Sequence, residues 1–323
     1  MSSVSFGDPN AVSLGLKHHT EIGFDLDMTC TGQGEGSSCV VPDWASRQDK
    51  TDGLAGRDNA VGALITAVQT MIPEFGSDSY TRLVEEGQAG VLFRIRGYNG
   101  QPNDDQVEAT LYIAAPFDSQ EGNTTPHWDG NDVWPVASDS LADGASLDNP
   151  RYQDPHAYVN NGVLVASLPE ASIRLPNGLI EGGGSINMRL VGAFLAGKLV
   201  EVEVGGSKRW QLEDVHLAGR WPTNDLVHQL SQFPEPPNFQ KPLCMDSSSY
   251  EVFRNLLCSF TDIFAGVASP TSVCNALSFA VALETIPARI GSVIEVEPPD
   301  ANRCPAETDP ANDSCGAPLP SFD

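Results

Sequence analysis

The chain of 323 residues carries 43 Asp and Glu against 18 Lys and Arg, a formal net charge of −25. Binding to nucleic acids or to anionic membrane surfaces requires clustered Lys and Arg, and because the sequence contains no such cluster both classes are excluded. Apolar residues make up 40% of the chain, but no window approaches 18 consecutive ones, so no membrane-spanning segment is predicted.

The N-terminal part is predicted to be irregular. Residues 1–57 are polar and rich in turn-forming residues, which indicates a segment that packs on the core without regular structure. No basic region followed by an apolar stretch is visible at the start, so the protein is expected to be either cytosolic or the mature form of a secreted protein, and its cysteines favour the second. Asp58 or Asn59 then caps a predicted helix that continues to Met71 and carries an apolar stripe at i, i+3, i+4 and i+7 from Val61.

From residue 89 the sequence changes to the two-residue alternation of β-strands. Residues 91–95 and 107–113 are predicted to be neighbouring antiparallel strands. Further predicted strands cover residues 157–168, 171–175, 185–196, 198–204, 208–219 and 277–283, and predicted helices cover 224–232 and 249–261. Many short strands separated by turns favour an antiparallel β-sandwich of the jelly-roll type, with two or three peripheral helices and disulfide-bridged loops.

The predicted domain organisation has three parts. The irregular segment 1–57 packs on a sandwich domain at 58–297, and residues 298–323 form a Pro- and Asp-rich tail with a bridged loop.

Seven cysteines are present, and none belongs to a CxxC pair, so structural zinc is not predicted. Cys30 with Cys39, and Cys304 with Cys315, each enclose a short turn-rich loop, and we predict a local disulfide in each loop. Two of the remaining three can pair while one stays free, and the sequence leaves that choice open: Cys244, Cys258 and Cys274. Disulfides indicate an oxidising compartment.

Hard oxygen donors gather in the N-terminal part. They are Asp25, Asp27, Asp49, Asp52, Asp58 and Asn59. Calcium takes six to eight such oxygens from irregular loops, so a calcium site is predicted here on general chemistry. The EF-hand pattern fails at Thr29 and Cys30, and helix capping is a sufficient structural role for Asp58.

The stretch HWDGNDVW at 127–134 combines aromatic and acidic groups. Trp128 and Trp134 can stack on sugar rings, while Asp129 and Asp132 hydrogen-bond hydroxyl groups or hold a cation. The structural alternative is a loop whose tryptophans close one end of the sandwich.

Catalytic signatures are weak. The stretch GAFLAGKL at 192–199 fails as a phosphate-binding loop because Leu199 stands where a hydroxyl is required, and HExxH is absent. Glu201 and Glu203 lie on one face of a predicted strand at a separation that glycosidases can use. An exposed strand face explains the same pair.

Four stretches carry a resemblance: GFDLDMTCTGQGEGSSC at 23–39, GRDNAVGALI at 56–65, NGQPNDDQVE at 99–108 and CNALSFAVAL at 274–283. Together they resemble an uncharacterised family of acidic, cysteine-bridged bacterial lipoproteins and secreted proteins. The resemblance implies the envelope or exterior of a Gram-negative bacterium, and it implies no catalytic or binding residue. The N-terminal lipobox cysteine that it leads us to expect is missing.

The sequence therefore predicts an extracellular or cell-envelope protein without catalytic activity, a binding or surface module stabilised by calcium. Its expected partner is a glycan or a surface protein. Two alternatives stay open: a secreted hydrolase that acts on polysaccharide with paired carboxylates, and a structural subunit of an envelope assembly.

Overall fold

The computed structural model describes residues 1–7, 18–46, 48, 50–72, 75–143, 146–176, 183–236, 239–267, 269, 271–296 and 303–318. Eight strands form one antiparallel sheet in the order β1-β9-β8-β7-β6-β5-β3-β2. Their bounds are β1 Ser3–Ser5, β2 Val91–Arg96, β3 Asp104–Ile113, β5 Tyr152–Asn160, β6 Val163–Leu175, β7 Ile186–Val204, β8 Ser207–Pro222 and β9 Ala276–Glu284. A separate parallel pair consists of β4, Val133–Ala137, and β10, Arg289–Ile294.

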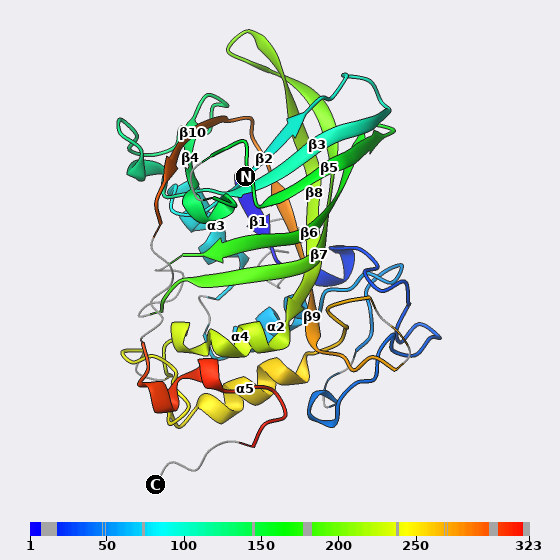
Figure 1. Ribbon diagram of the computed structural model, residues 1–323, viewed down its shortest axis with the longest axis vertical. Coiled ribbons are helices and arrows are strands. Elements are labelled where there is room, and N and C mark those ends of the chain that lie inside the picture. The colour runs from blue at the N-terminus through cyan, green and yellow to red at the C-terminus, as the bar shows by residue number, and fades with distance from the viewer. Residues whose placement is uncertain are drawn as a thin grey trace.

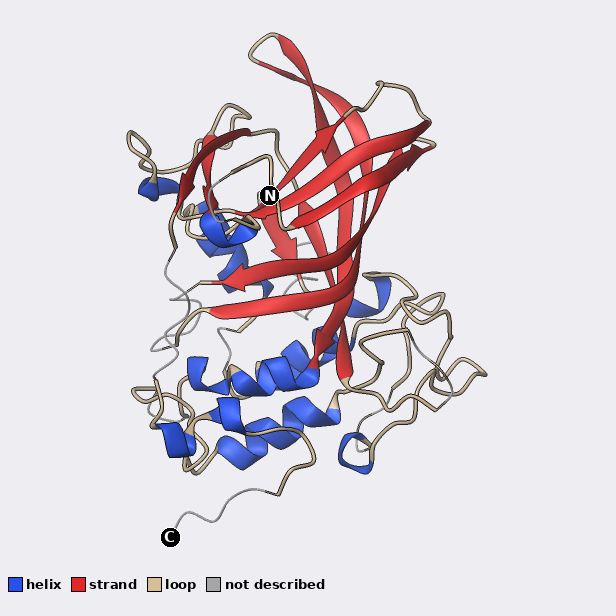
Figure 2. Ribbon diagram, viewed as in Figure 1, coloured by secondary structure: helices blue, strands red, loops and turns tan. Residues whose placement is uncertain are grey.

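Four α-helices lie within the described residues. They are α2 Ala60–Val68, α3 Ser77–Glu85, α4 Thr223–His228 and α5 Tyr250–Ser259. Short 3-10 helices cover His19–Glu21, Asp43–Ala45, Phe117–Ser119, Ser138–Ser140, Leu230–Gln232, Ala306–Thr308 and Pro310–Asn312. Figure 2 shows the helices α2, α4 and α5 gathered at one end of the curled sheet. Among the described residues, no helix is long and apolar enough to cross a membrane.

The prediction of a mainly β fold is confirmed, but the main sheet is a curled half-barrel and not clearly one layer of the predicted two-sheet sandwich. The two predicted strands at 185–196 and 198–204 are one strand, β7, of 19 residues, because Gly197 stays inside the ladder instead of making a turn. Register shifts between Val191 and Phe194, and between Ala196 and Lys198, interrupt its pairing with β8. Such bulges bend a long strand and increase its twist, so one sheet curls around its own core (Figure 1).

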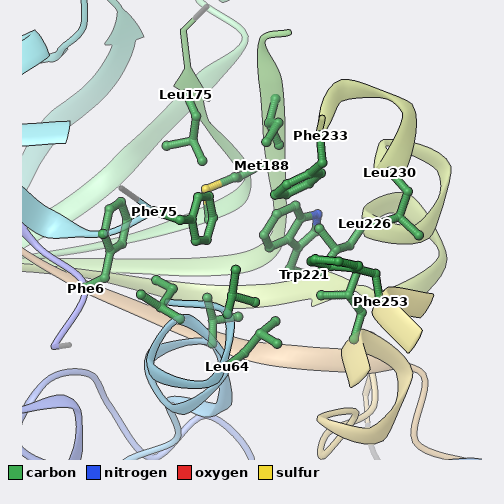
Figure 3. A pocket seen from close by; sticks show the side chains of 16 residues that line it. Phe6, Leu64, Phe75, Leu175, Met188, Trp221, Leu226, Leu230, Phe233 and Phe253 are labelled. Atoms are coloured by element: carbon green, nitrogen blue, oxygen red, sulfur yellow. The ribbon is translucent and has the colours of Figure 1, made fainter. Parts of the chain in front are cut away.

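The concave face of the sheet holds the main apolar core, which α2, α4 and α5 cover. A cavity of about 30 Å³ lies between sheet and helices, and apolar side chains from both line it (Figure 3). Trp221 of β8 is one of them, and its buried Nε1 has no hydrogen-bond partner among the described residues. Since a cavity of this size holds one or two water-sized groups at most, it is a small packing gap of the core.

Most predicted elements between residues 59 and 284 are confirmed. Asn59 caps α2 by accepting a hydrogen bond from the Gly62 amide at 3.2 Å. The stretch 157–168, predicted as one strand, is a β5–β6 hairpin whose turn places Asn161 and Gly162 at positive φ, the pairing that two-residue hairpins favour. Helix α3 was not predicted, although its buried Tyr80, Leu83 and Val84 follow helical spacing.

The two ends of the chain are more ordered than predicted. Strand β1 pairs with β9 from Ser3 to Ser5, so the segment 1–57 contributes a strand to the sheet. Residues 303–318 pack on α5, where the buried Arg254 forms an ion pair with the buried Asp313 at 2.7 Å. Tyr250 donates a hydrogen bond to the same carboxylate at 2.8 Å. The tail is therefore attached to the body through α5.

The predicted pairs Cys30–Cys39 and Cys304–Cys315 are wrong. The three disulfides are Cys39–Cys274, Cys244–Cys304 and Cys258–Cys315, with sequence separations of 235, 60 and 57 residues, and Cys30 is a free thiol. Of the four cysteines in the two predicted rings, Cys39, Cys304 and Cys315 each pair with a cysteine far away in the sequence instead. Next to Cys39, for example, Val40 forms a parallel bridge with Val273, which leaves the Cys39 and Cys274 Cα atoms 5.3 Å apart. Three disulfides indicate an oxidising, extracytoplasmic location.

The pairing gives a direct test. We expect the double variant Cys39→Ser/Cys274→Ser to lose roughly 4–5 kcal/mol of unfolding free energy, because a long closed loop is opened in the unfolded chain. The variant Cys30→Ser, which removes no disulfide, should unfold like the wild type. Denaturant titration without reductant measures both, and peptide mapping that found Cys30 linked to Cys39 would contradict the pairing.

Candidate metal centre

The N-terminal segment lies against the face of β8 and β9 opposite the main core. Ile22 and Leu26 pack there on Ala218 of β8 and Ala280 of β9, together with Ile263. Figure 1 shows this blue segment beside the orange chain that precedes β9, and the Cys39–Cys274 disulfide joins the two. Small side chains on the strands let both loops approach the sheet closely, which brings their polar groups together.

Three carboxylates meet in this layer: Asp25, Asp27 and Asp58, whose closest oxygens all lie within 4.8 Å of one another. Asp25 is exposed, Asp27 is half-buried and Asp58 is only 3% exposed. Two oxygens bound to one calcium ion at about 2.4 Å can be no further apart than about 4.8 Å. The spacing therefore suits a single cation between the three side chains.

Local backbone turns aim these carboxylates. The oxygens Oδ1 of Asp25 and of Asp27 both accept a hydrogen bond from the Thr29 amide, at 3.1 and 3.0 Å. Met28, exposed and at a φ of 60°, turns the chain so that both side chains reach that amide. Asp58 accepts a hydrogen bond from the Leu26 amide at 2.6 Å, between the two aspartates in sequence. The sequence spacing D-x-D thus folds into a loop around one buried acid.

Two more carboxylates stand behind the three. Asp52 accepts a hydrogen bond from the Thr31 amide at 2.6 Å and shares a side-chain hydrogen bond with Asp58. Asp262, on the loop before β9, accepts from the amide and hydroxyl of Ser278 at 2.8 and 2.5 Å. Of the five predicted metal ligands, Asp25, Asp27, Asp52 and Asp58 are therefore close together, and Asp49 lies outside the described residues.

The carboxylates raise one another's affinity for protons. Burial first, and then Asp262 and Asp27, raise the pKa of Asp58 to about 9. Burial and the same two neighbours raise the pKa of Asp52 to about 7, and burial raises that of Asp262 to about 6. At neutral pH Asp58 therefore holds a proton that a divalent cation would displace.

The local charge balance is negative. Against five carboxylates, the cations that act on them among the described residues are Arg220 of β8, beside Asp27 and Asp58, and Lys50, beside Asp262. The pKa of the Cys30 thiol is raised by partial burial and then by Glu35 and Asp25, so Cys30 supplies no thiolate. The donor set is oxygen alone, which favours a hard cation such as Ca²⁺ over zinc.

The predicted glycan-binding residues make structural contacts. Trp134 is 4% exposed and packs against Trp128, with ring centroids 5.4 Å apart. Asp132 is buried and accepts hydrogen bonds from the amides of His127 and Trp128, and Asp129 accepts one from the Asn131 amide within the turn. The loop is thus held by its own contacts, and a glycan-binding role for these residues stays a prediction.

The carboxylate pair proposed for hydrolysis lies on the exposed hairpin between β7 and β8. Glu201 and Glu203 are both exposed, and Glu201 pairs with Lys208 at 2.5 Å. The groups that sequence reasoning missed are Asp262 and Arg220, which come from much later in the chain. Neither residue belongs to a motif in the sequence, so no local signal identifies them.

Comparison with protein-family models, with curated proteins and with solved structures found no match for this chain. The resemblance to secreted bacterial proteins stays a prediction.

The raised pKa of Asp58 predicts a pH dependence. Because the folded state keeps a proton up to a pKa of about 9 that the unfolded chain releases near 3.8, stability from this group is lost as pH rises through that interval. We therefore compare the unfolding free energies of the wild type and of Asp58→Asn in the presence of a chelator. The wild-type value minus the variant value should decrease from pH 7 to pH 9. Denaturant titrations at three pH values measure it, and a difference that stays constant with pH contradicts the buried proton.

Proposed function

We propose that this is an extracytoplasmic binding or surface protein, without catalytic activity, whose outer loops are stabilised by a calcium ion. The observation that supports it is the group Asp25, Asp27 and Asp58, three carboxylates within reach of one ion beside two further acids. Mutual repulsion makes this layer unfavourable when all its acids are ionised, and a divalent cation removes that repulsion.

The ion would act on the loops that the protein presents to its surroundings. Asp25 and Asp27 precede Cys39, which the disulfide attaches to Cys274. A cation held between these residues and Asp58, next to the start of α2, would connect the loop to the body of the fold. We propose a glycan or another surface protein as the partner of the exposed loop surface.

Calcium should stabilise the protein, and Asp58 should be required. At a calcium concentration 100 times the Kd, we expect about 2.7 kcal/mol of stabilisation, or roughly 5 °C in Tm, increasing from pH 6 to pH 9 because binding displaces a proton. Asp58→Asn preserves the side-chain shape and the acceptor for Leu26, so it should raise Tm in chelator and abolish the calcium response.

The matched control is Asp118→Asn, an exposed acid on the 3-10 helix Phe117–Ser119. It should keep the full calcium response. A wild-type Tm that is the same in calcium and in chelator sinks the calcium part of the proposal. Glycan-array binding with and without calcium then tests the partner.

One observation favours a second function, acid–base catalysis. Asp52 and Asp262 both line a polar pocket of about 50 Å³ together with His19 and Lys50, and the pKa of Asp52 is raised to about 7. Carboxyl groups with such pKa values can donate and accept protons at neutral pH. Hydrolysis of a polysaccharide panel that Asp52→Asn removes, while the Tm is retained, would support this function in place of the first.

A further inference from the structure

The curled sheet does not close into a barrel, and the opening lies between the unpaired edges of β8 and β2. Strand β9 pairs with β8 only from Val215 to Pro222, so the described pairing leaves one edge of β8 from Ser207 to Asp214 without a neighbouring strand. Strand β2, at the other end of the sheet, pairs with β3 alone. The chain that follows β9 crosses this opening, where Thr285 donates a hydrogen bond to the Leu212 carbonyl at 2.6 Å.

A cavity of about 180 Å³ lies in the opening, and we call it the seam pocket. Its walls are β2 around Leu92 and Phe93, β8 from Arg209 to Leu212, and residues 285–290. It is six times the volume of the core cavity in Figure 3 and exceeds the roughly 150 Å³ that suffices for a benzene molecule. The seam pocket therefore has room for one six-membered ring with a small substituent.

Two arginines of the seam pocket lie next to each other. Arg209 Nη2 and Arg289 Nη2 are 3.4 and 3.5 Å from the same oxygen, Oδ1 of Asn131. Arg209 also donates to the Gly130 carbonyl at 2.7 Å. The Asn131 side chain and the Gly130 carbonyl are both neutral. These hydrogen bonds therefore hold two positive guanidinium groups near each other without neutralising the charge of either.

Within the described part of the chain, six other arginines are paired with carboxylates, whereas Arg209 and Arg289, like Arg57, Arg151 and Arg220, are not. Arg209 and Arg289 differ from these three because they share one pocket. Among the described residues, neither Arg209 nor Arg289 forms an ion pair, although the chain has 43 acidic residues and a net charge of −25. Ion pairs to Asp or Glu are formed by Arg82, Arg94, Arg96, Arg174, Arg189 and Arg254. Two adjacent guanidinium groups beside a cavity of mixed polar and apolar lining leave donors available for an anion from outside.

We propose that the seam pocket binds a small organic anion. The guanidinium groups of Arg209 and Arg289 hold its carboxylate, and its flat apolar body packs against Phe93, Leu92 and Leu212. Arginine suits this task because its planar donors match a carboxylate in two-point contact. A neutral sugar uses neither charge, and an extended peptide exceeds the volume.

The test uses benzoate as the probe, with benzamide as its uncharged counterpart and inorganic phosphate as an anion without an apolar body. Isothermal titration of the full-length protein should show benzoate binding at least about tenfold tighter than either counterpart, since both the charge and the ring contribute. The indole of Trp210, which is 41% exposed at the pocket, should report the same binding by fluorescence.

Variants locate the site. Arg289 is exposed, so Arg289→Gln should fold normally and weaken benzoate about tenfold or more. Ala288→Phe, an exposed position that lines the pocket, should block binding by filling it. The matched control Arg151→Gln, also exposed, should bind like the wild type. Equal affinity for benzoate and benzamide, or unchanged binding by Arg289→Gln, overturns the proposal.

Discussion

The Cys39–Cys274 disulfide, together with the Val40–Val273 bridge beside it, is the constraint on which the outer layer of this protein depends. It fixes a loop that precedes α2 onto a loop that precedes β9. Closing a loop of 235 residues is entropically costly for the unfolded chain, so the covalent link favours the folded arrangement. Because both loops lie on β8 and β9, their carboxylates are held close together.

That placement concentrates charge where the solvent cannot screen it well. Asp58 is buried, hydrogen-bonded to Leu26 and surrounded by other carboxylates, and its pKa of about 9 is the physical consequence. Isolated acids avoid such positions unless a proton, a cationic side chain or a metal ion compensates them. Arg220 supplies part of that compensation. A bound calcium ion would supply the rest, which connects ion binding to the order of the outer loops.

The long strands explain the second candidate site. Bulges in β7 and β8 curl the sheet so strongly that its two ends approach, but β9 is too short to pair along the whole of β8. Residues 285–290 cover the resulting opening in place of a strand. This leaves a cavity lined by side chains of β2 and β8. Incomplete closure thus places Arg209 and Arg289 together, although they are 80 residues apart in the chain.

The sequence by itself determined the local features: the helix that Asn59 caps, the β2–β3 and β7–β8 hairpins, the strand at 277–283 and the oxidising compartment. Each of these follows from side-chain periodicity, turn residues or cysteine content over short spans. It also placed Asp25, Asp27, Asp52 and Asp58 in one candidate group. Only the tertiary structure decided the cysteine pairing, the single curled sheet and the contribution of Asp262 and Arg220. These depend on contacts between residues far apart in the chain, 57 to 235 positions for the disulfides. A periodic pattern cannot encode such contacts because it reports only on neighbours along the chain.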